Sequence, residues 1–145
     1  MNYELARRAF TLVEVLIVVA ILGILGAIVL PEVQGYTQKA KENAAKDNLR
    51  ILREAISRYA ADHNDIPPGY VEDNSSGSVS AVWFKSQLEN GYLSEIPKNP
   101  FNDSSLIMVY PNNYPIPSTE IGGPGWLYKP ATKTIILNTT EYMDY

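Results

Sequence analysis

The chain has 145 residues, ten prolines, no cysteine and a formal net charge of −4. This length accommodates one small domain in addition to a long helix. The lack of cysteine excludes disulfide bonds and thiol catalysis, and an acidic chain without a basic patch is not expected to bind nucleic acid.

An apolar run extends from Phe10 to Leu30 and contains one charged side chain, Glu14. A helix over this run is about 31 Å long, which is enough to cross the hydrocarbon core of a bilayer. Arg7 and Arg8 precede the run and are expected to stay in the cytoplasm, so that the rest of the chain lies outside. A secretory signal peptide is the competing interpretation, but its apolar region is shorter and ends at a cleavage site of small residues.

Glu14 is unusual because a carboxylate at the centre of a bilayer costs about 2.5–3.5 kcal/mol. Two interpretations follow from its place near the start of the run. It can reach the interface and stay hydrated, as long polar side chains near a helix end do. Alternatively, it has a partner or a function within the apolar environment.

The residues around the start of the run, ARRAFTLVE, resemble the processing site of type IV prepilins and type II secretion pseudopilins. The resemblance implies a leader of residues 1–9, cut by a prepilin peptidase between Ala9 and Phe10, and methylation of the new amino group of Phe10. The family usually has glycine before the cut, where this chain has Ala9. The resemblance also makes Glu14 the fifth residue of the mature chain and implies that it pairs with the Phe10 amine of a neighbouring subunit, which sets the subunit register.

Helix-weakening residues gather in the second half of the run, at Gly23, Gly26 and Pro31. The related filament proteins carry a glycine and a proline at the places of Gly23 and Pro31. We therefore expect this segment to melt partly in an assembled filament and to be helical in a single subunit. Ala20, Gly23 and Ala27 recur at spacings of three and four, which places small residues on one face for close helix approach.

Residues 32–64 continue the helical pattern with a polar surface. Leu49, Leu52, Ile56 and Tyr59 form one apolar stripe, which is predicted to pack against a sheet. The charged side chains of this segment are interpreted as a solvated face with pairs such as Glu54 and Arg58. A second interpretation is that this net positive helix pairs with the net negative remainder of neighbouring subunits.

Residues 65–145 are predicted to form a small globular head. The helix is expected to stop near His63, because prolines follow, and His63 is interpreted as a helix-end residue without a site. A short helix is predicted after Ser80, whose side chain is expected to cap its start, and Gly91 is expected to end it in a left-handed conformation. Three strands in an antiparallel sheet are expected at Leu106–Tyr110, Trp126–Lys129 and Thr134–Asn138. The last two are expected to form a hairpin through a short turn at Pro130–Lys133.

Three Asn-X-Ser/Thr triplets begin at Asn74, Asn102 and Asn138. Such triplets are acceptors for N-linked glycans, but they are frequent by chance.

The sequence therefore predicts an α+β, pilin-like fold with a leader (1–9), a membrane or filament-core helix (10–31), an amphipathic helix (32–64) and a head (65–145). The predicted function is a structural subunit of a type IV pilus-like surface filament, made first in the inner membrane and assembled with itself by a membrane assembly platform. The alternatives are a major pseudopilin of type II secretion and, in another class, a bitopic binding protein that does not polymerise. No enzyme activity, cofactor or metal site is predicted.

Overall fold

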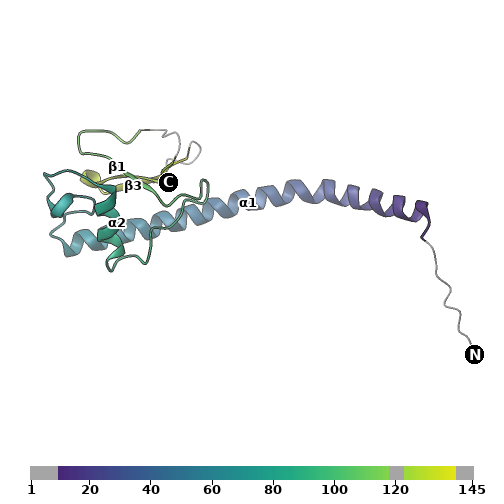
Figure 1. Ribbon diagram of the computed structural model, residues 1–145, viewed down its shortest axis with the longest axis horizontal. Coiled ribbons are helices and arrows are strands. Elements are labelled where there is room, and N and C mark those ends of the chain that lie inside the picture. The colour runs from purple at the N-terminus through teal and green to yellow at the C-terminus, as the bar shows by residue number, and fades with distance from the viewer. Residues whose placement is uncertain (1–9, 118–122, 140–145) are drawn as a thin grey trace, which may run out of the picture. The chain divides into compact units, whose positions relative to one another are not determined.

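The computed structural model describes residues 10–117 and 123–139, with the backbone alone for residues 29–34. It contains a long helix, a short helix and a small sheet, labelled in Figure 1. The elements are α1 (Leu12–Asp62), α2 (Ala81–Glu89), β1 (Ile107–Val109), β2 (Trp126–Lys129) and β3 (Thr134–Leu137), with 3-10 turns at Val71–Asp73 and Pro130–Thr132. The predicted α+β class is confirmed.

The chain divides into two compact units, Met1–Lys39 and Ala40–Tyr145, and α1 contributes residues to both. In the first unit, the backbone of α1 is helical through Gly23, Gly26 and Pro31. Helix-weakening residues therefore do not interrupt α1 in the single chain. Their melting in an assembled filament stays a prediction.

The second unit is built on the apolar stripe of α1. The four predicted stripe residues are all buried, with exposed fractions of 3% or less. They pack in one cluster with the inner side chains of α2 and of the sheet. The members from those elements are Phe84, Leu88, Trp126, Tyr128, Ile135 and Leu137. The second half of α1 therefore owes its stability to tertiary packing, as amphipathic helices generally do.

Strands β2 and β3 form the predicted antiparallel hairpin, in which Trp126 pairs with Leu137 and Lys129 with Thr134. The connecting turn ends at Lys133, whose φ of +52° lies in the left-handed region. The first three residues of β2, Trp126 to Tyr128, are buried because this strand lies in the middle of the sheet. The hairpin prediction is confirmed to within one residue.

The prediction that the sheet is antiparallel throughout is wrong for β1. This strand lies beside β2 and runs parallel to it, with Ile107 opposite Trp126 and Val109 opposite Tyr128. A parallel pair needs a crossover connection of about a dozen residues or more, and residues 110–125 supply one. The sheet is therefore mixed, in the order β1-β2-β3.

Helix α2 begins after Ser80, whose carbonyl accepts a hydrogen bond from the Phe84 amide at 3.0 Å. The Ser80 side chain makes no capping hydrogen bond, so it marks the helix start without the predicted side-chain contact. The helix ends before Gly91, which has a φ of +110° and so supplies the predicted left-handed residue.

The segment between α1 and α2 is fixed by a polar network around Asp73. The Tyr59 hydroxyl donates to Asp73 Oδ1 at 2.6 Å, and Gln87 Nε2 donates to the same oxygen at 2.7 Å. Gln87 Oε1 accepts the Gly69 amide at 2.7 Å. Burial, followed by the hydrogen bond to Asp73, raises the pKa of the Tyr59 hydroxyl, which therefore stays a donor. Asp73 itself has a φ of +52°, and these two bonds hold it there.

Candidate assembly segment

Residues 12–28, called here the first half of α1, are apolar on every side apart from Glu14 and have no buried face. Every side chain from residue 12 to residue 28 is exposed, except Gly26, which is half-buried. Twelve large aliphatic side chains are at least 50% exposed: Leu12, Val13, Val15, Leu16, Ile17, Val18, Val19, Ile21, Leu22, Ile24, Leu25 and Ile28. Over the part of the chain that the structure describes, no helix is long and apolar enough to cross a membrane. Because its large aliphatic side chains are exposed, the helix over residues 12–28 has no hydrophobic core of its own in the described structure.

The glycines of this segment lie on open helix surface. A methyl group added at Gly23 or Gly26 would meet no atom within 4 Å in the described structure. The backbone is therefore accessible there to another helix, as in the small-residue contacts of membrane helices.

Thr11 and Glu14 form a capping box at the start of α1. The Thr11 amide and hydroxyl donate to Glu14 Oε2 at 3.2 and 3.1 Å, and the Glu14 amide donates to Thr11 Oγ1 at 3.2 Å. Reciprocal bonds of this kind satisfy backbone donors that the first turn leaves free. The carboxylate is also favourably placed at the positive end of the helix dipole. Within the single chain, Glu14 therefore already has partners.

Thr11 was not predicted from the sequence to belong to this segment's hydrogen-bonded start. The signal was present, since threonine followed three residues later by glutamate, before an apolar run, is the pattern of a capping box.

The predicted processing residues lie next to this box. Phe10 is non-helical and 80% exposed, and it directly precedes Thr11. Ala9 lies outside the described residues. The structure thus places Phe10 and Glu14 at the same end of α1, whereas Gly23, Gly26 and Pro31 lie further along the helix.

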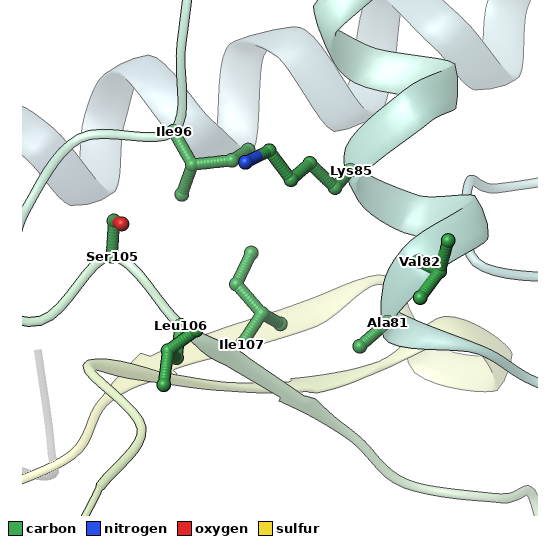
Figure 2. A pocket seen from close by; sticks show the side chains of 7 residues that line it. All are labelled: Ala81, Val82, Lys85, Ile96, Ser105, Leu106 and Ile107. Atoms are coloured by element: carbon green, nitrogen blue, oxygen red, sulfur yellow. The ribbon is translucent and has the colours of Figure 1, made fainter.

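A small apolar groove lies between α2 and β1 in the head, as Figure 2 shows. It has a volume of about 180 Å³, and Ile96 and Ile107 lie among its lining residues. Val82 and Leu106 at its rim are 76% and 66% exposed. Lys85, the one charged residue of the lining, lies 3.8 Å from Glu89 on its own helix. The groove therefore offers apolar contact but no arrangement suited to catalysis.

His63 behaves as a helix-end residue. Its Nδ1 lies 2.8 Å from the Tyr59 carbonyl oxygen, and its ring stacks on that of Tyr59 with centroids 3.9 Å apart. Within residues 10–117 and 123–139, no group of three or more His, Asp or Glu side chains is arranged to hold a metal ion. The exposed aliphatic side chains and the hydrogen bonds between Thr11 and Glu14 both lie at the start of α1.

Comparison with known proteins agrees with this location. Residues 5–30 match the family model described as the prokaryotic N-terminal methylation motif. The chain is 31% identical to the type II secretion system core protein G of Pseudomonas aeruginosa, over 84% of this chain and 81% of that protein. It is 32% identical to the protein of the same name from Aeromonas hydrophila, over 67% of this chain and 69% of that protein.

A third relative is the type IV major pilin protein PilE1 of Neisseria gonorrhoeae, 32% identical over 74% of this chain and 62% of that protein. No solved structure matches the chain significantly. The methylation motif, the exposed apolar helix and these similarities lead to one conclusion. The chain belongs to the family of type IV pilins and type II secretion pseudopilins.

Proposed function

We propose that the chain is a structural subunit that polymerises into a filament through the first half of α1. The observation that carries this proposal is the exposure of twelve large aliphatic side chains on all sides of that helix. Full burial of one Val, Leu or Ile side chain gains about 1.5–3 kcal/mol. Such a helix is stable only where lipid or other helices cover it. A bundle made of the same helix from many copies buries the whole set.

Before assembly, the proposed subunit is an inner-membrane precursor with residues 1–9 in the cytoplasm and the head outside. The basic pair Arg7 and Arg8 supports this orientation. A prepilin peptidase cuts between Ala9 and Phe10, and Phe10 is then methylated. The match of residues 5–30 to the methylation motif supports this order of events.

Glu14 provides the proposed subunit register. Its capping bonds to Thr11 satisfy the carboxylate in the free subunit. In the filament, the same carboxylate faces the cationic Phe10 amine of a neighbouring copy in an apolar environment. Removing one partner of such a buried pair costs about 3–5 kcal/mol, because the other charge is left unpaired. An apolar helix can slide along its neighbours, and this pairing opposes sliding.

The relatives bear on which filament the subunit builds. The alignment spans 81% of the P. aeruginosa secretion protein but 62% of the gonococcal pilin. A larger share of this chain also aligns with the secretion protein, 84% against 74% for the pilin. This difference favours a type II secretion pseudopilin over a surface pilin.

The substitution Glu14→Ala tests polymerisation. We expect filaments in the sheared fraction, and cross-linked oligomers in membranes, to fall at least tenfold while membrane insertion is retained. Glu95→Ala is the matched control, because Glu95 is an exposed carboxylate of the head. Unchanged oligomers in Glu14→Ala would support a bitopic protein that does not polymerise.

A further inference from the structure

Three Asn-X-Ser/Thr triplets occur in the chain, and the structure separates them. Asn138 is only 6% exposed, and its Nδ2 donates to the Pro124 carbonyl at 2.7 Å. Asn102 Nδ2 donates to the same carbonyl at 3.0 Å, and its Oδ1 accepts the Ser104 amide. In both cases the amide nitrogen that a glycan would occupy is bonded to the backbone of the folded head.

Asn74 is different. It is exposed, and its Oδ1 accepts the Ser76 amide at 3.1 Å, which leaves Nδ2 without a partner among the described residues. Residues 75–78 are also exposed. The Gly77 amide donates to the Asn74 carbonyl at 2.8 Å and closes a tight turn over the triplet. Asn74 therefore presents its side-chain amide at the tip of a loop.

Backbone pairing fixes the two ends of this loop, residues 71–78. Val71 and Ser78 are joined by a backbone hydrogen bond of 3.0 Å, and Tyr70 and Val79 form an isolated antiparallel bridge. Asp73, next to Asn74, receives the bonds from Tyr59 and Gln87 described above. The acceptor is therefore accessible in the folded protein, and its modification does not require the head to unfold.

We propose that Asn74 is the attachment site of an N-linked oligosaccharide. The proposal rests on the proposed function in one respect, since it requires the head to lie outside the inner membrane. The acidic residues Glu72 and Asp73 precede Asn74, whereas Asn102 and Asn138 follow uncharged residues. Glu72 is exposed and available to a basic side chain of a transferase.

The co-substrate is an oligosaccharide linked to a polyprenyl pyrophosphate. Transfer forms a bond between Asn74 Nδ2 and C1 of the first sugar and breaks the bond between C1 and the pyrophosphate oxygen. The lipid pyrophosphate leaves with the bonding electron pair, and the amide loses one proton to a base. No oxidant or reductant takes part.

Tryptic peptides of the chain from its native membranes test the proposal. The three asparagines fall in separate peptides, residues 59–85, 99–133 and 134–145, because trypsin does not cut before Pro130. We expect mass spectrometry to find a glycan on peptide 59–85 alone. Asn74→Gln and Ser76→Ala should abolish it, whereas Ser76→Thr and Asn102→Gln should keep it.

Two results would overturn the proposal. One is an unmodified peptide 59–85 from a chain whose head is digested by external protease in spheroplasts, which leaves the proposed function intact. The other is a glycan that persists in Asn74→Gln. A head protected from external protease would contradict both proposals, because neither allows a cytoplasmic head.

Discussion

The two halves of α1 differ in where they find a hydrophobic environment. In the second half, the stripe of Leu49, Leu52, Ile56 and Tyr59 is buried against the chain's own head. In the first half, aliphatic side chains cover every side of the helix and are exposed. The second half is thus stabilised by the fold of one chain. The first half requires lipid or further copies of the same helix, and this requirement connects the structure to polymerisation.

The largest expected effect on stability is the difference between two leucine-to-alanine substitutions, one in each half of α1. Leu52→Ala removes a side chain that is 0% exposed and should lower the free energy of unfolding of the head by about 2–5 kcal/mol, because a cavity remains. Leu22 is 61% exposed, and Leu22→Ala should change that free energy by less than about 0.5 kcal/mol. Urea denaturation of the full chain in detergent, followed by tryptophan fluorescence, measures both. Equal losses would contradict the division of α1.

A smaller expected effect is the dependence of the head's free energy of unfolding on pH. Burial, with a contribution from Tyr70, raises the pKa of the Tyr128 hydroxyl above the usual value of 10.0. The folded state then keeps this proton at pH values where the unfolded chain loses it. Stability is therefore complete below about pH 10 and should fall above it, by about 1.4 kcal/mol per pH unit for one tyrosine.

Tyr128→Phe isolates this contribution. The Tyr128 hydroxyl has no hydrogen-bond partner among the described residues, so the variant should lose little stability at pH 8. Between pH 10 and pH 11, its free energy of unfolding should fall less steeply than that of the unmodified chain. Parallel slopes in the two proteins would show that Tyr128 does not carry the effect.

The next expected effect is a loss of helix stability that is confined to the first half of α1. Thr11→Val removes the hydroxyl that bonds the Glu14 amide and carboxylate, and should destabilise the start of α1 by about 0.5–2 kcal/mol. Faster hydrogen exchange at the Glu14 amide would report the loss. Thr11→Ser keeps the hydroxyl and serves as the control. Unfolding of the head should be the same in both variants.

The smallest expected effect lies on the outer face of the second half. Arg58 pairs with Glu54 one helical turn away, and the two side chains are 65% and 52% exposed. Arg58→Ala should cost only about 0.3–0.5 kcal/mol, because water screens such pairs. A loss above 1 kcal/mol in urea denaturation would mean that this face has a further role in the single chain.

The sequence predicted those parts of the fold that depend on local patterns. The apolar stripe around Leu52, the hairpin turn at Lys133 and the helix end beside His63 each follow from residues close together in the chain. The parallel pairing of β1 with β2 was not predicted, because it depends on the path of residues 110–125. No short-range signal specifies that path.

For the functional residues too, local sequence signals allowed prediction and contacts with distant residues did not. Phe10 and Glu14 were identified because ARRAFTLVE resembles the processing site of type IV prepilins, and Thr11 could have been found from the capping-box pattern. The difference in burial between Asn74, which is exposed, and Asn138, which is buried, was not predicted from the sequence. It depends on Pro124, a residue distant in sequence whose carbonyl binds the Asn138 amide.

The central claim is that a processed helix holds many copies of this chain together. Intact mass with N-terminal fragmentation, on protein from membranes and from sheared filaments, tests it most directly. We expect filaments whose chains begin with N-methylated Phe10, and membranes that contain precursor and processed chain. A chain that keeps Met1 in every fraction and never leaves the membrane would contradict polymerisation and identify an uncut membrane anchor.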